Sequence, residues 1–145
     1  MISHQPLPLP NTIVKFHADY SEDDGEPAKK RYHLVVETDP VKQEITLLKI
    51  TSRWKNYFLQ AKLGKVKCLP KLSFATLNRL ITFDWSTWHL DYRKFYICQI
   101  HQGNCVEKWR FTKIVRKLKK FWKNPLNRDL LKIRLDWSNL KVMDK

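Results

Sequence analysis

The sequence has little glycine, few cysteines and no long apolar run. It holds 3 Gly and 3 Cys in 145 residues. No stretch of about 18 apolar residues occurs, so we expect no transmembrane helix. Residues 1–11 contain no basic region followed by an apolar one, so we expect no signal peptide.

The cysteines number three, form no CxxC pair and share no metal-ligand spacing with histidine. An odd count without a secretion signal predicts reduced thiols in a cytoplasmic protein. We therefore expect Cys68, Cys98 and Cys105 to be small buried side chains, and we expect no metal site.

Acidic residues are also scarce, with 14 Asp and Glu against 28 Lys and Arg, which gives a net charge of +14. A cationic surface attracts polyanions: nucleic acid, an acidic protein or an anionic membrane. Eight cations crowd one segment: Lys108, Arg110, Lys113, Arg116, Lys117, Lys119, Lys120 and Lys123. This uneven distribution predicts a binding face.

Apolar residues are abundant, at 43% of the chain. The length suits a single domain, 1–145. Short β-branched and aromatic runs predict strands, with an exposed acidic loop at 18–28. The expected strands are 12–17, 31–38, 44–51, 57–61, 73–83 (one strand or a pair with a bend), 95–101 and 131–137. The last could instead be a short helix capped by Asn127.

One helix is expected, at 104–123. Asn104 and Glu107 have the spacing of a capping box, and Asn124-Pro125 ends the helix. Its apolar stripe comprises Phe111, Ile114, Val115, Leu118, Phe121 and Trp122. The pattern predicts a mainly β fold with α: a small SH3-like barrel at 12–101, the amphipathic helix, and a basic tail at 124–145.

The pattern of residues 29–52 predicts two strands joined by a short turn. Arg31 opens the first strand and Thr51 closes the second. In an antiparallel hairpin the start of one strand lies beside the end of the next, so these residues are expected to meet. A cation beside a hydroxyl suits a phosphodiester site.

The order of these segments resembles the MazF/PemK toxin family. The resemblance rests on NTIVKF, a long polar loop, KKR before LVV, a strand ending in ITS, and GKVKCLPKLSFATLNRLITFD. In that last segment the matching residues are Leu69, Pro70, Lys71, Leu72, Ser73, Leu77, Ile81, Thr82, Phe83 and Asp84. Three positions depart from the family pattern: Asn11-Thr12 replaces Gly-Asp, Tyr32 replaces Pro, and Asn78 replaces an acid.

The resemblance implies an SH3-like barrel, usually a homodimer, and a metal-independent endoribonuclease that needs no cofactor. Its catalytic pair would be Arg31 and Thr51. A guanidinium can hold two phosphate oxygens by charged, bidentate bonds while the ribose 2′-hydroxyl attacks. The resemblance also implies an acidic antitoxin as partner.

Further residues are candidates for holding single-stranded RNA or moving protons. Basic and aromatic side chains suit splayed bases. The RNA-binding candidates are Lys29, Lys30, Ser52, Arg53, Trp54, Lys55 and Asn78, although Trp54 could instead lie in the core. His17, His33, His89 and His101 could supply a general acid or base, or be structural.

Two other readings remain open at this point. A non-catalytic SH3-like module that binds nucleic acid or an acidic protein would keep the same charge, and the departures at Tyr32 and Asn78 favour it. Binding to a membrane surface through the basic helix is a weaker reading.

Overall fold

The computed structural model describes residues 7–18, 30–54, 59–66, 68–86, 91, 93–124 and 130–143. The acidic loop expected at 18–28 lies almost wholly outside them. The strands are β1 Thr12–Ala18, β2 Lys30–Asp39, β3 Glu44–Thr51, β4 Gln60–Lys62, β5 Phe74–Thr76, β6 Arg79–Asp84, β7 Phe95–Ile97, β8 Leu131–Asp136 and β9 Leu140–Lys141. The helices are α1 Lys108–Lys123 and the 3-10 turn η1 Trp137–Asn139.

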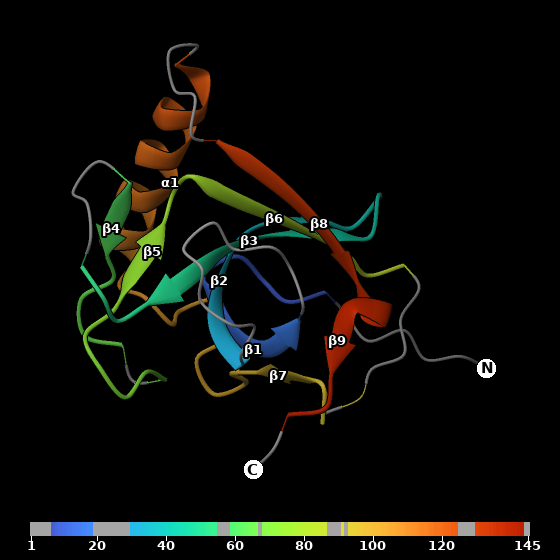
Figure 1. The fold of residues 1–145 in the computed structure, drawn as a ribbon. Coiled ribbons are helices and arrows are strands. Elements are labelled where there is room, and N and C mark those ends of the chain that lie inside the picture. The colour runs from blue at the N-terminus through green and yellow to red at the C-terminus, as the bar shows by residue number, and fades with distance from the viewer. Residues whose placement is uncertain are drawn as a thin grey trace.

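The described strands form one strongly bent sheet whose path runs β4-β5-β3-β2-β1-β7 (Figure 1). Strand β3 makes the bend, because Glu44–Leu47 pairs with β6 whereas Ile50 and Thr51 pair with β5. The expectation of a mainly β fold with one long helix is confirmed. Among the described strands the ladder does not close on itself, so the barrel stays a prediction.

Both faces of the sheet are buried, so its central strands carry apolar side chains on both sides. Leu34 of β2 joins a cluster that packs against α1, and its neighbour Val35 joins a second cluster on the other face. The second cluster is rich in aromatic rings: Phe16, Phe83, Trp85, Phe95 and Trp137. Tilted and edge-on ring pairs such as Phe83 with Trp137, 5.2 Å between centroids, fill it.

Helix α1 covers the first cluster with its apolar stripe, of which Ile114 and Leu118 are buried. The predicted start at residue 104 is wrong, since the helix begins at Lys108 and Glu107 makes no side-chain cap. The cause is tertiary: both amide atoms of Asn11 bind the backbone of Val106, at 2.7 and 2.9 Å, and the chain bends at residues 105 and 106 before the helix begins. The predicted end at Asn124 is confirmed.

Three other expected strands can be compared with the strands that the structure contains. The strand expected at 95–101 is confirmed only for 95–97, because the chain then turns through residues 100–103. The stretch expected at 73–83 is a strand pair with a bend, β5 and β6. Strand β4 covers 60–62, whereas residues 57 and 58 of the expected strand lie outside the described part.

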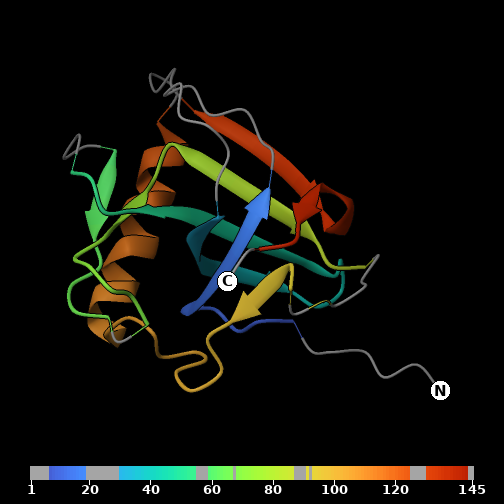
Figure 2. The same cartoon turned by 60° about the horizontal axis from the view of Figure 1, so that its bottom comes forward.

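The segment expected as a final edge strand is confirmed as β8, which pairs in parallel with β6. The chain then turns through η1, and β9 pairs with the end of β1 (Figure 2). Trp137, on η1, is buried in the aromatic cluster. The C-terminal residues thus complete the core rather than trail from it.

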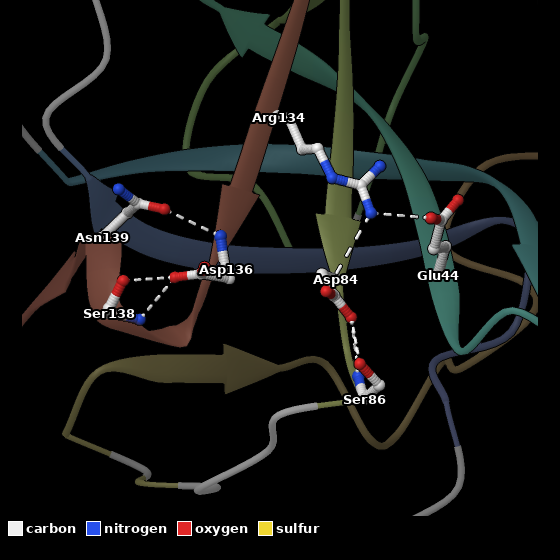
Figure 3. Close-up of polar contacts among 7 residues, drawn as sticks. All are labelled: Glu44, Asp84, Ser86, Arg134, Asp136, Ser138 and Asn139. Atoms are coloured by element: carbon white, nitrogen blue, oxygen red, sulfur yellow. Dashed lines mark hydrogen bonds and ion pairs between the residues drawn. The ribbon is translucent and has the colours of Figure 1, made fainter.

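A polar network holds this C-terminal crossing in place (Figure 3). Arg134 of β8 reaches Glu44 of β3 at 2.9 Å and lies 3.9 Å from Asp84 of β6. The Asp136 carboxylate accepts the Ser138 backbone N–H at 2.8 Å, and the Asn139 side chain accepts the Asp136 N–H. A hydrogen bond from Ser86, followed by the nearby Arg134 charge, lowers the pKa of Asp84.

The cysteines differ from the prediction of three reduced thiols. Cys68 and Cys98 form a disulfide with 6.8 Å between their Cα atoms, and Cys105 is a free, buried thiol. Sequence spacing could not show this, because the pairing depends on where the 63–73 loop meets the residues after β7. No described helix has the length and apolar character needed to cross a membrane.

Candidate functional site

The hairpin of β2 and β3 brings Arg31 and Thr51 to one pocket. The pairing of β2 with β3 reaches His33 opposite Lys49, so Arg31 and Thr51 each lie two residues beyond its last pair, at the same end of the hairpin. Both side chains line a pocket of about 250 Å³. We call it the basic pocket.

The lining of the basic pocket has three kinds of side chain. Cations and hydroxyls surround a small apolar base: Lys30, Arg31, Arg53 and Lys71; Tyr32, Thr51, Ser52 and Ser73; and Ile50, Leu69 and Pro70. No carboxylate stands among these described lining residues. Positive charge and hydroxyl donors together suit an anion that carries several acceptor oxygens.

One wall of the pocket is the turn that follows β3. The Thr51 Oγ1 accepts the Arg53 backbone N–H at 3.2 Å. The Arg53 carbonyl accepts the Gln60 side-chain amide at 3.0 Å, and the Gln60 carbonyl accepts the Lys117 ammonium at 3.0 Å. Because Thr51 accepts in this turn, its own hydroxyl proton can point to a ligand.

The other wall is the loop before β5, whose residues are not among the site candidates predicted from the sequence. Its Leu69, Pro70, Lys71 and Ser73 line the pocket, with Ser73 Oγ bound to the Lys71 carbonyl at 2.9 Å. The signal was present in the sequence, because these residues belong to the segment that carries the MazF/PemK resemblance. Only the fold shows that the segment faces Arg31.

His33 does not serve the pocket, because the structure places it in the core. It is 1% exposed and stacks on Phe16 with 4.0 Å between ring centroids. Burial, followed by the nearby positive charges of Arg31 and Lys49, lowers the pKa of His33 to about 3. His17 and His101 are not among the residues that line the basic pocket, and His89 lies outside the described residues.

The RNA-binding candidates are divided among several places. Lys30, Ser52 and Arg53 line the basic pocket. Asn78 is buried between β5 and β6, where its carbonyl accepts the Leu131 N–H at 3.0 Å, and it does not line the pocket. Lys29 and Lys55 lie outside the described residues.

Trp54 lies in a second and larger hollow, of about 770 Å³, which we call the aromatic groove. Its ring is 44% exposed and packs on Phe74 at 4.9 Å, so Trp54 is not a core residue. The groove lies between β4, β5 and α1, and its lining is Trp54, Gln60, Ala61, Lys62, Leu72, Phe74, Arg110, Lys113, Ile114, Arg116, Lys117 and Lys120. In segments 53–54 and 71–74, successive residues line the basic pocket and the aromatic groove alternately. The basic pocket and the aromatic groove are therefore next to each other.

Comparison with known proteins supports the fold and leaves the activity open. No protein-family model matches the sequence, and no curated protein matches it. A solved structure is similar: a chain of the MazE-MazF complex (Form-III) from Deinococcus radiodurans, with a TM-score of 0.51 and 15% sequence identity. The similarity covers 79% of this chain and 95% of that chain. The fold is therefore similar to that of a chain of this MazE-MazF complex.

Proposed function

We propose that this chain is a MazF/PemK-like endoribonuclease, built on an SH3-like barrel, that cleaves single-stranded RNA at the basic pocket. The observation that carries the proposal is the lining that joins Arg31 and Thr51 with three further cations and three further hydroxyls. An RNA phosphodiester matches that lining in charge and in acceptor atoms. The MazF-like fold supports the same reading.

The reaction uses the substrate's own nucleophile. The ribose 2′-oxygen attacks the adjacent phosphorus, the bond from phosphorus to the 5′-oxygen breaks, and the 2′-hydroxyl proton ends on the leaving 5′-oxygen. One product carries a 2′,3′-cyclic phosphate and the other a 5′-hydroxyl. Arg31 would hold two non-bridging oxygens as their charge grows, and the Thr51 hydroxyl would donate to the phosphate. Because Arg31 supplies the charge and the ribose supplies the nucleophile, we propose that no metal ion is required.

The experiment that tests the activity incubates a long single-stranded RNA with the protein in EDTA. We expect discrete cuts that end in a cyclic phosphate, and no cuts in single-stranded DNA of the same sequence. Arg31→Ala should slow cleavage by about 10²–10³-fold, the usual effect of removing one transition-state donor. Arg31→Lys is the matched control, since it keeps the charge and removes the planar fork. Cleavage by the Ala variant at the wild-type rate would remove Arg31 from the mechanism.

Thr51 offers a second matched pair. Thr51→Ser keeps the hydroxyl and should keep most of the activity, whereas Thr51→Val keeps the shape and should lose about tenfold or more. Val also removes the acceptor for the Arg53 N–H, so RNA affinity and melting temperature should be measured beside the rate. Equal rates for the Ser and Val variants would show that the hydroxyl takes no part.

The aromatic groove extends the pocket into a path for the strand. Trp54 and Phe74 present ring surface for base stacking, and the cations of α1 face the same hollow. Stacking on an aromatic ring contributes about 1–3 kcal/mol per base, so Trp54→Ala should weaken RNA binding by roughly tenfold or more. Val41→Ala, at a side chain 91% exposed in the turn between β2 and β3, is a control expected to leave binding unchanged.

An acidic antitoxin is the proposed partner, and a homodimer is the proposed assembly. The MazE-MazF likeness and the net charge of +14 support the acidic partner, and the MazF/PemK resemblance of the sequence supports the homodimer. An acidic segment that lies in the aromatic groove would compete with RNA for the same cations. Light scattering of the purified chain tests the dimer, and competition by an acidic amphipathic peptide tests the partner surface.

A non-catalytic module is the second candidate function. The observation that favours it is chemical: neither an imidazole nor a carboxylate, the usual general acids and bases, stands among the described lining residues to move the proton. Under this reading the protein binds RNA, and Arg31→Ala weakens the binding without any cleavage to lose. Binding with no cut in any RNA would decide for the module.

A further inference from the structure

All three cysteines of the chain meet in one place, although they come from three separate segments. Their sulfur atoms lie within 4.8 Å of one another. Cys68 and Cys98 are bonded, and the Cys105 Sγ lies 3.9 Å from the Cys68 Sγ. The basic pocket and the aromatic groove use none of these three side chains.

Two of the three are held by the backbone of β1 and of the residue just before it. The Cys98 N–H donates to the Ile13 carbonyl and the Cys105 N–H to the Asn11 carbonyl, each at 3.0 Å. Both side chains are buried. The third, Cys68, comes from the loop between β4 and β5. A rigid pair and one residue from a loop therefore converge on a single point.

We propose that in the reduced protein these three sulfurs bind one Zn²⁺ ion. Four-coordinate zinc holds thiolate sulfur at about 2.3 Å, which puts two sulfurs of a tetrahedral site about 3.8 Å apart. The sulfurs of Cys68 and Cys105 already have that separation, at 3.9 Å. Water or an added ligand completes the fourth position. The disulfide between Cys68 and Cys98 is the oxidised, metal-free form of the same centre.

Reduction of the disulfide and binding of zinc balance in electrons and protons. A phosphine reductant gives two electrons to the Cys68–Cys98 bond and becomes a phosphine oxide, with its oxygen taken from water, which leaves three thiols. One Zn²⁺ ion then replaces the three thiol protons, which pass to the buffer.

The position of the centre gives it a structural consequence. Cys68 directly precedes Leu69, Pro70 and Lys71, which line the basic pocket. A metal bound to Cys68 fastens this wall to the segments that carry Cys98 and Cys105. Zinc binding is nevertheless independent of the proposed ribonuclease activity, since its measurement needs no RNA.

The test uses the full chain, reduced with a phosphine, loaded with Zn²⁺ and dialysed to remove free metal. We expect about one zinc per chain by mass spectrometry of the metal, as a single site requires. Titration with Co²⁺ should give the charge-transfer absorption of thiolate ligands. Cys68→Ser, Cys98→Ser and Cys105→Ser should each lose most of the zinc, with circular dichroism to verify folding.

A second measurement uses only the wild-type chain, so it stands even where a Ser variant fails to fold. Alkylation followed by intact mass should count three reactive thiols after reduction, and slower labelling of all three when Zn²⁺ is added. No retained zinc would overturn the proposal. Zinc that persists in all three Ser variants, or a Cys68–Cys98 bond that survives the reductant, would overturn it as well.

Discussion

His33 should make this protein lose stability as the pH falls from about 6.5 to about 3. The side chain is 1% exposed, stacks on Phe16, and has its pKa lowered from 6.5 to about 3, chiefly by burial. In the unfolded chain the ring regains its ordinary pKa. Between these two values the unfolded state binds more protons than the folded state, so acid favours unfolding.

The size of the effect follows from the two pKa values. At about pH 4.5 the unfolded ring is almost fully protonated while the folded ring is almost fully neutral. The resulting loss, relative to about pH 7, is about 2.5 kcal/mol from this one residue. A domain of this size has a free energy of unfolding of about 5–15 kcal/mol, so the loss is a large fraction of the total.

The assay is urea unfolding followed by tryptophan fluorescence at about pH 7 and about pH 4.5, on the wild type and on His33→Phe. The Phe ring keeps the stack on Phe16 and cannot be protonated. It loses the 3.1 Å contact between His33 Nδ1 and the Arg31 carbonyl, which costs about 1 kcal/mol at either pH. Carboxylates titrate in both proteins, so the difference between the two pH dependences isolates His33. If acid lowered the free energy of unfolding equally in the two proteins, His33 would not be a buried imidazole that stays neutral in the folded state.

Three further substitutions test the packing. Trp137→Ala should cost about 3–5 kcal/mol, because it opens a cavity in the aromatic cluster. Asn11→Ala should cost about 2–4 kcal/mol, because it removes both buried bonds to Val106 and puts Ala at a φ of 64°. Arg134→Ala should change stability by less than about 1 kcal/mol, because its ion pair with Glu44 has an arginine side chain 62% exposed.

Each of these can be checked by the same urea unfolding, with Trp109→Ala as a control. Trp109 is 56% exposed on α1, so its loss should cost little compared with Trp137. Equal costs for the two tryptophans would contradict the packing of the C-terminal segment. Asn11→Gly separates the two parts of the Asn11 effect, since Gly tolerates the positive φ and loses only the hydrogen bonds.

Local pattern predicted the parts of the fold that depend on neighbours in sequence. The bounds of β3 at 44–51 and the meeting of Arg31 with Thr51 follow from strand periodicity and one short turn. The end of α1 at Asn124 and its apolar stripe follow in the same way from helical periodicity. The start of α1 was predicted wrongly, because a contact to Asn11, 95 residues away, decides it.

What the sequence by itself determined is therefore the hairpin, the meeting of Arg31 with Thr51 in one pocket, and the basic, amphipathic helix. The tertiary structure decided the second wall of the pocket, the burial of His33, the parallel pairing of β8 with β6 and the convergence of three cysteines. The physical reason is the range of the interactions. A period of 2 or 3.6 residues is set by the backbone, whereas the packing of two hydrophobic clusters selects which distant segments meet.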